Sequence, residues 1–470
     1  MIRPSSTPLD LTAGRRRAVL VTMCFALALV VSAVASLNVA LPSLARDLGA
    51  TETELQWLVD AYALLFAGLL LPVGALGDRF GRRGVLIAGL VIFGGAYAAG
   101  AMLSSPEALI AMRALAGVGA ALIMPVTLSV ITTTFQAEER ARAVAVWAGV
   151  AGAGAMVGLL LSGALLELAS WPWVFAASAV WALLALAGTL AFVPATRDEE
   201  RPALDPVGAG LSAAGLSALV FGIIEGPVRG WDDGVVLLAL AGGVAGLVAF
   251  VLWELRAERP MLDPRLFALR GFSAGSLSIT LQFFALFGFL FAILQFVQTV
   301  LGYSPLEAAA AMLPMGIMVV ALSRGVAPRL AERIGLRAVT ALGLSTMGAG
   351  LAVCSTLGAG AGYEHLLAGL LVTGAGAGLA TAPATTAIVS SLPGNKQGVA
   401  SAVNDTAREL GGALGIAVVG SVLKAEGLSE ALLVAAGVLA AGAVLVALRG
   451  PRRAPAGVAP GGRVSAPAAA

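Results

Sequence analysis

Runs of about twenty apolar residues follow one another along nearly the whole chain, separated by short polar stretches. A helix of about 20 residues crosses the hydrocarbon core of a bilayer, so each run is long enough to span a membrane. Of the 470 residues, 59% are hydrophobic and 12% are charged, whereas soluble domains average about 45–50% apolar and about 25% charged residues. The sequence therefore predicts an all-α integral membrane protein.

Fourteen such runs can be counted, and no soluble domain interrupts them. We expect residues 1–17 to form an N-terminal tail and residues 449–470, which are rich in Pro, Ala and Gly, to form a disordered tail. The predicted spans are residues 18–41, 55–76, 84–103, 107–133, 143–166, 173–193, 207–226, 234–253, 272–298, 306–328, 337–358, 365–390, 399–422 and 429–448.

The basic residues of the short loops predict the orientation in the membrane, because Lys and Arg are retained on the cytoplasmic side. The even-numbered loops and both tails carry most of them, including Arg15, Arg79, Arg140 and Arg329, whereas the odd-numbered loops are short or acidic. Both termini are therefore predicted to be cytoplasmic. Losing one span from the count would break this pattern, which favours an even number.

A basic stretch occurs twice, about half a chain apart. Gly74 to Arg83 reads GALGDRFGRR, and Pro328 to Arg337 reads PRLAERIGLR. We interpret each as a short loop at the membrane surface, since lipid does not accommodate irregular backbone. The residues singled out for a conformational gate are Gly74, Asp78, Arg79, Gly81, Arg82, Arg83, Glu332 and Arg333. A simpler interpretation is that these charges only anchor the topology, and both can hold.

Small residues also recur at matching offsets in the two halves. Gly117 and Gly119 align with Gly374 and Gly376, in stretches that start near Glu107 and Glu364. Two related halves are typical of transporters built from repeats. We expect an N-terminal six-helix bundle at 18–200, two inserted helices at 201–260 and a C-terminal six-helix bundle at 261–448.

Ionisable residues inside the predicted spans require a reason, since each costs about 2.5–3.5 kcal/mol at mid-membrane. Asp405 and Glu409 are four residues apart in span thirteen and share a helix face, with Arg408 beside them. This net negative group suits a lipophilic cation or a proton, and is our first choice for coupling. The alternative is a neutralised network that only fixes helix packing.

A second charged pair is expected between spans two and four. Asp60 and Arg113 each lie about six residues into their span, so the two side chains could pair at similar depth. We predict a role in substrate contact or proton coupling, and the alternative is again a structural ion pair. Gln295 and Gln298 make span nine unusually polar and are candidate substrate contacts.

Several stretches together resemble the major facilitator superfamily, and the layout resembles its fourteen-helix drug:proton antiporter branch. The resemblance covers roughly residues 15 to 448. The matching stretches are GALGDRFGRR, Asn38-Val-Ala-Leu-Pro42, Gln56-Trp57, Asp60-Ala-Tyr62, Arg113 with Gly117 and Gly119, Tyr303-Ser-Pro305 and Asn404-Asp405-Thr-Ala-Arg408-Glu409-Leu-Gly-Gly412.

This resemblance implies two pseudo-symmetric six-helix bundles plus two inserted helices, with Asn38 and Tyr62 as further candidate substrate contacts. It also implies alternating access driven by a proton gradient, with no cofactor. Two positions differ from the branch. Ala33 stands where the first helix often carries an acid, and Leu159 follows Gly158 where a Gly-Pro pair is usual.

We therefore predict a proton-coupled exporter of hydrophobic or cationic drugs or antibiotics in the bacterial cytoplasmic membrane, acting as a monomer. The alternatives are a dedicated exporter of one endogenous metabolite and, given Ala33 and Leu159, a facilitator of uptake. An enzyme is not expected, since the chain has two isolated cysteines and one histidine. A nucleic-acid partner would need a clustered basic face on a soluble module, which is lacking.

Overall fold

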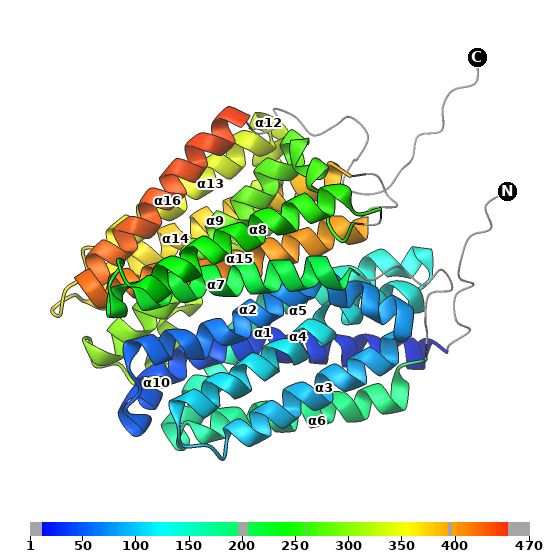
Figure 1. Ribbon diagram of the computed structural model, residues 1–470, viewed down its shortest axis with the longest axis horizontal. Coiled ribbons are helices and arrows are strands. Elements are labelled where there is room, and N and C mark those ends of the chain that lie inside the picture. Colours follow the sequence, from blue (N-terminus) through cyan, green and yellow to red (C-terminus); the bar gives the residue numbers. More distant parts are fainter. Residues whose placement is uncertain (1–11, 196–204, 259, 393–396, 450–470) are drawn as a thin grey trace.

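The computed structural model describes residues 12–195, 205–258, 260–392 and 397–449, and this part is built from helices without a strand (Figure 1). Both predicted tails lie largely outside the described residues. The helices are α1 Ala13–Leu48, α2 Glu52–Phe80, α3 Arg82–Gly100, α4 Pro106–Thr134, α5 Ala137–Leu168, α6 Pro172–Phe192, α7 Pro206–Arg229, α8 Gly234–Arg256, α9 Arg270–Thr299, α10 Pro305–Ala311, α11 Leu313–Gly325, α12 Ala327–Ile334, α13 Leu336–Cys354, α14 Tyr363–Ser390, α15 Gln397–Glu426 and α16 Leu428–Arg449, with a short 3₁₀ turn at Pro264–Ala268.

Local sequence signals mark where several helices begin. Ser105 accepts a hydrogen bond from the Ala108 amide at the start of α4. Ser304 and Glu307 form a reciprocal capping box at the start of α10. Such caps satisfy amides that have no partner inside the helix.

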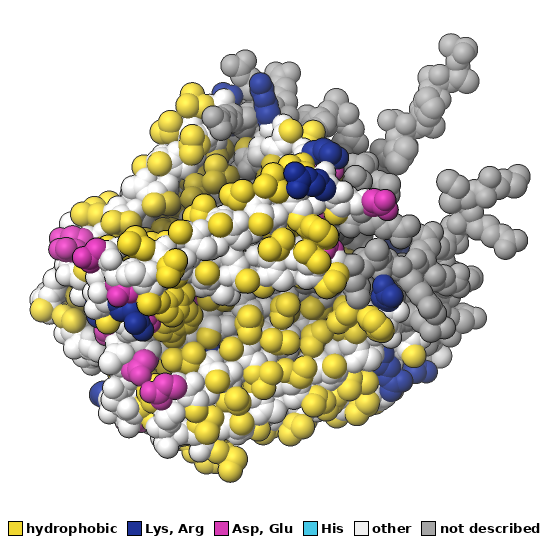
Figure 2. Space-filling model, viewed as in Figure 1, with side chains coloured by type: hydrophobic (Ala, Val, Ile, Leu, Met, Phe, Trp, Pro, Cys, Tyr) yellow, Lys and Arg dark blue, Asp and Glu magenta, His cyan; other side chains and the backbone are white. Residues whose placement is uncertain are grey.

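Twelve helical segments in the described part are long and apolar enough to cross a membrane. The helices α2 and α5, of 29 and 32 residues, are not among the twelve. The count of fourteen spans therefore remains a prediction. Hydrophobic side chains cover much of the face shown in Figure 2, and charged side chains gather towards its two ends. This distribution is that of a protein with an apolar belt.

The helices pack around two main hydrophobic cores. The first core is contributed almost entirely by α1–α6, and the second mainly by α9–α16. We call these two groups of helices the first and second bundle. In Figure 1, α13 and α16 of the second bundle run at a marked angle to α1 of the first.

The remaining helices α7 and α8 pack against each other, and α7 also contacts both bundles through α2 and α15. The Trp57 indole donates to the Glu225 carboxylate over 3.2 Å, and the Ser421 hydroxyl donates to the Ile223 carbonyl over 3.1 Å. Glu225 also pairs with Arg229 at 2.9 Å. This inserted pair therefore bridges the seam between the bundles on one side.

Hydrogen bonds near one end of the molecule join the described parts of the two bundles. Lys424 donates to the Thr53 hydroxyl over 2.9 Å, and the Gln298 amide donates to the Val39 carbonyl over 3.1 Å. Gly163 of α5 lies here directly against the backbone of Pro305 and Leu306. We call this the closed end; it contains the α1–α2 and α15–α16 connections.

Both basic stretches proved more helical than expected, which corrects the prediction of short loops. The helix α2 continues to Phe80 and α3 begins at Arg82, so only Gly81 interrupts them. Gly335 occupies the same place between α12 and α13. The two glycines have φ angles of 104° and 87°, which side chains with a Cβ rarely adopt. The duplicated motif thus places its sharp turn on one glycine in each half.

The predicted tenth span is interrupted as well. It is divided between α10 and α11 at Met312, and α12 follows as a separate short helix. Pro314 lies at the start of α11. Proline has no backbone N–H to donate, and its ring clashes with the carbonyl of the preceding helical turn, so a helix is often broken there.

Candidate functional site

Three charged side chains lie in the middle of α15, which is packed between α9 and α2. Asp405 and Arg408 form a loose ion pair with 3.9 Å between Oδ1 and Nη1, and their side chains are 14% and 24% exposed. Glu409 is buried at 6% exposure. Two carboxylates and one guanidinium leave a net charge of −1 when all three are ionised.

Close helix packing holds this group in place. Gly411 and Gly415 of α15 lie against the backbone of Thr280 and Phe284 in α9, with no room for a Cβ. Small residues allow such approach where lipid provides no hydrophobic drive between helices. The sequence Asn404-Asp405-Thr406 is a poor helix former in isolation, so tertiary contacts maintain α15 here.

The charged group is contacted from two further helices, α14 and α9. The Thr385 hydroxyl in α14 donates to the Asn404 side-chain oxygen over 3.1 Å, and the Asn404 amide donates to Asp405 over 3.5 Å. The Arg408 guanidinium carbon lies 4.7 Å from the centre of the Phe283 ring in α9. The charged group therefore has a polar side and an aromatic side.

Glu409 faces the first bundle. Its Oε2 atom has no hydrogen-bond partner. Its charge is close enough to interact with Arg408, with Asp405 and, across the seam, with Tyr62 of α2. The site thus lies on α15 where this helix packs against α2 of the first bundle.

The predicted pair between Asp60 and Arg113 is wrong. Arg113 is 1% exposed, donates to the Leu58 carbonyl over 2.9 Å and to the Tyr97 hydroxyl over 2.6 Å, and stacks 4.3 Å above the Tyr62 ring. Leu58 and Tyr62 share a face of α2, whereas Asp60 is two residues from each and lies about 200° around the helix. Equal depth in the membrane was therefore insufficient for contact.

Asp60 is completely buried, and neither carboxylate oxygen has a hydrogen-bond partner. Ala63 and Leu64, one turn along the same face, pack against α7 and against Ala413 and Ala417 of α15. Asp60 therefore lies in the seam between the bundles, in an environment that offers its charge no compensation.

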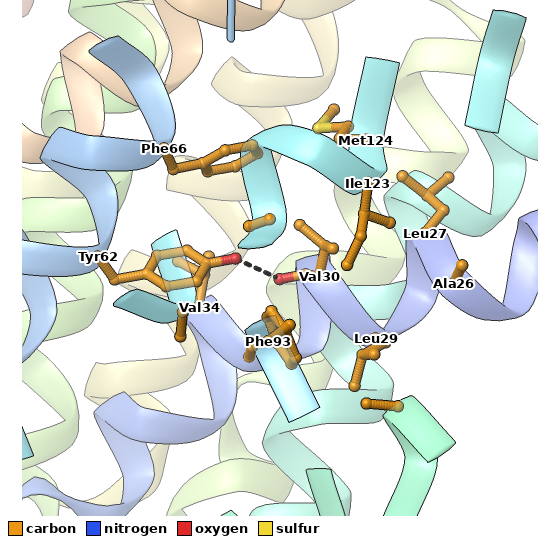
Figure 3. Close-up of a cluster of buried hydrophobic side chains, with 14 of the residues drawn as sticks. Ala26, Leu27, Leu29, Val30, Val34, Tyr62, Phe66, Phe93, Ile123 and Met124 are labelled. Carbon is orange, nitrogen blue, oxygen red and sulfur yellow. Dashed lines mark hydrogen bonds between the residues drawn. The ribbon is translucent and has the colours of Figure 1, made fainter. Parts of the chain in front are cut away.

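The four uncharged candidates lie around the same seam. Tyr62 points towards α1 and donates to the Val30 carbonyl over 3.2 Å (Figure 3). Asn38 and Gln295 donate to carbonyls one turn back in their own helices, and the Asn38 oxygen has no partner. Gln298 joins α9 to α1 at the closed end. Their role as substrate contacts stays a prediction.

The described contacts of the candidate gate residues Arg79 and Arg83 lie within the first bundle. Arg83 donates to the Leu190 carbonyl at the end of α6 over 2.7 Å, within the first bundle, and Arg82 is buried. Arg79 lies beside the Phe80 ring. Glu332 and Arg333 are exposed. Gly74 lies within α2, and the side chain of Asp78 lies outside the part that the structure describes.

Tyr97 and Thr385 were not among the residues predicted from the sequence. Tyr97 anchors Arg113, and Thr385 orients Asn404. Neither lies in a recognisable motif, so the sequence offered no signal for them. The positions that differ from the branch are both buried, with Ala33 in the first core and Leu159 in the second.

Comparison with known proteins agrees with this architecture. A family model described as "Major Facilitator Superfamily" matches residues 23–416 and 275–470 of the chain. The fold is similar to a peptide transporter solved with sulfate, with a TM-score of 0.71 and 15% identity over 94% of this chain and 96% of that chain. It also resembles a human organic anion transporter, with a TM-score of 0.63 and 18% identity over 92% and 99% of the two chains.

Curated relatives are similar over most of their length. The puromycin resistance protein of Streptomyces alboniger is 37% identical over 82% of this chain and 77% of its own. The cephamycin export protein of Amycolatopsis lactamdurans is 35% identical over 85% and 83%. A multidrug efflux pump of Mycolicibacterium smegmatis is 36% identical over 82% and 76%. This chain belongs to the Major Facilitator Superfamily of membrane transporters.

Proposed function

We propose that the chain exports hydrophobic, cationic or amphipathic compounds from the bacterial cytoplasm in exchange for protons. The observation that carries this proposal is the charged group of Asp405, Arg408 and Glu409, placed on a central helix at the seam between two bundles. The relatives named for resistance, export and efflux support the direction. We further propose that a monomer carries out this transport, and that it is divided into six, two and six spans as the sequence predicts.

The loop charges support an orientation with both termini in the cytoplasm. In this orientation the closed end faces outwards. We infer that Asp405 and Arg408, whose side chains are 14% and 24% exposed, are reached from the cytoplasm. The described conformation then corresponds to the inward-facing state of an alternating-access cycle.

The cycle uses the two acids of α15. With both deprotonated, the net negative site binds a cationic substrate from the cytoplasm. Rocking of the bundles opens the closed end, so that Lys424 and Gln298 leave their partners on α2 and α1. A proton from outside then neutralises Asp405 or Glu409 and releases the substrate, and deprotonation towards the cytoplasm restores affinity. The energy source is the proton gradient, and no covalent intermediate forms.

The test is uptake of ethidium into inside-out proteoliposomes under an imposed pH gradient. Asp405→Asn and Glu409→Gln are expected to abolish the pH-driven component, because neither amide can carry a proton. Thr346→Val, which alters an exposed hydroxyl on the outer surface of α13, is the matched control and should transport normally. Unchanged coupling in both single variants and in the double variant would exclude the assigned role.

A dedicated exporter of one compound is the second candidate, favoured by the relative named for cephamycin export. A panel of dyes, quaternary amines and antibiotics separates the two. Broad transport supports efflux of many compounds, whereas transport of a single antibiotic supports a dedicated exporter. Equilibration without response to the pH gradient would instead indicate a facilitator.

A further inference from the structure

Arg408 makes two kinds of contact at once. Its guanidinium lies over the face of Phe283 at 4.7 Å and pairs with Asp405 at 3.9 Å. A cation over an aromatic face is attracted by the ring quadrupole, and a carboxylate attracts the same cation by charge. These are the two contacts that a lipophilic aromatic cation would itself seek at this site.

Arg408 is held loosely in this position. The ion-pair distance of 3.9 Å is beyond hydrogen-bond range. Its Nε atom is buried and has no hydrogen-bond partner. Arg113, by comparison, donates through Nε to the Leu58 carbonyl over 2.9 Å and through Nη1 to the Tyr97 hydroxyl over 2.6 Å, although its Nη2 atom is also buried without a partner. The described contacts of Arg408 are therefore looser than those of Arg113, which makes Arg408 the cation that a substrate can displace.

We propose that Arg408 is an internal surrogate for the substrate, which occupies the Phe283 face and the Asp405 carboxylate until a planar aromatic cation displaces it. This inference rests on the proposed function and assigns its substrate class. Phe283 becomes the residue that selects aromatic cations. Its ring is itself oriented by an edge contact from Phe287, with ring centres 5.6 Å apart.

The return of Arg408 also keeps a cation beside the Asp405 and Glu409 carboxylates when no substrate is bound. When the substrate leaves, the guanidinium returns to Asp405, so the carboxylates are not left alone in a buried site. Arg408 thus promotes release of the substrate at the expense of affinity. Its removal should tighten binding, which is the opposite of what loss of a binding residue would do.

The experiment measures ethidium binding by fluorescence to the purified full chain in lipid nanodiscs. Arg408→Gln should tighten binding by about three- to thirtyfold, and Phe283→Leu should weaken it by about two- to thirtyfold, the range that cation–π energies span. Phe296→Leu removes a ring from the same helix that packs on the second core, and should leave binding unchanged. The neutral dye N-phenyl-1-naphthylamine should respond to none of the three.

Arg408→Gln could tighten cation binding in two ways, by removing charge repulsion or by removing competition for the Phe283 ring. A double-mutant cycle separates these two explanations. If Arg408 and substrate share the Phe283 face, Phe283→Leu must weaken ethidium binding more in the Arg408→Gln background than in the native chain. Equal losses in the two backgrounds, or tighter binding without any effect of Phe283→Leu, would overturn the surrogate.

Folding and function are read out independently. Phe283→Trp keeps an aromatic face and should bind ethidium at least as tightly as the native chain, so the proposal stays testable should Arg408→Gln fail to fold. If the native chain shows proton-driven transport but the cycle is additive, the inference fails and the proposed function stands. If the native chain binds ethidium and shows no proton-driven transport, the proposed coupling fails and the surrogate is judged by the cycle alone.

Discussion

Asp60 offers a sharp test of the conformational cycle, because its carboxylate is completely buried with no partner on either oxygen. An ionised side chain at such depth costs about 2.5–3.5 kcal/mol on insertion scales. This cost applies to the conformation in which α2, α7 and α15 close around Asp60. A change that abolishes the charge should therefore favour this closed-end conformation.

The perturbation is Asp60→Leu, with Asp60→Asn as the isosteric version. The native carboxylate, when ionised, bears the burial cost in the closed-end conformation and loses it by hydration when the bundles part. Asp60→Leu removes this cost, so the ratio of closed-end to open-end molecules should rise by on the order of a hundredfold. Asn retains a buried amide without a partner, which still costs about 1–3 kcal/mol, so its shift should be smaller.

Electron paramagnetic resonance distances report this equilibrium. Spin labels at Glu52 and Glu426 lie on exposed positions of α2 and α15 near the closed end, and the buried Cys24 and Cys354 are first replaced by alanine. The short-distance population should grow in Asp60→Leu.

Thr134→Val is the matched control, since Thr134 is also buried without a partner but lies in α4 within the first bundle. The reasoning would be refuted by an unchanged distance distribution in Asp60→Leu, or by growth of the long-distance population. A shift of equal size in Thr134→Val would attribute the effect to general stabilisation.

Three further predictions concern packing and turns. Arg113→Gln should lower the free energy of unfolding by about 3 kcal/mol, because it breaks a buried network and leaves the Tyr97 hydroxyl unpaired. Tyr97→Phe should lower it by only about 1 kcal/mol. Equal losses for the two variants in thermal unfolding would contradict the network. Gly81→Ala and Gly335→Ala should each cost about 1–3 kcal/mol because of their positive φ angles, whereas Gly95→Ala, which meets no atom within 4 Å, should be neutral in the same assay. Gly117→Leu should prevent stable expression, since its side chain would enter the Tyr62 backbone; a normally folded variant would show that the α2–α4 crossing can shift.

Much of the architecture could be predicted because bilayer thickness and loop charge act locally on the sequence. The apolar runs gave most helices, and the matching offsets of Gly81 and Gly335 gave the duplicated turn. The i, i+4 spacing of Asp405 and Glu409 already placed both acids on one face. The pairing of Asp60 with Arg113 failed because depth along two helices was known and rotation about their axes was not.

By itself, the sequence determined that this is a helical membrane protein with related halves and with two acids and one arginine, Asp405, Glu409 and Arg408, inside one apolar run of its second half. Only the tertiary structure decided that Arg113 turns to Tyr62 and Tyr97, that α7 bridges both bundles, and that Arg408 lies over Phe283. The physical reason is that these helices are apolar on nearly every side, so no periodic pattern reveals which face is inside. Close approach at glycines such as Gly411 and Gly117 sets that rotation, through contacts between residues far apart in the chain.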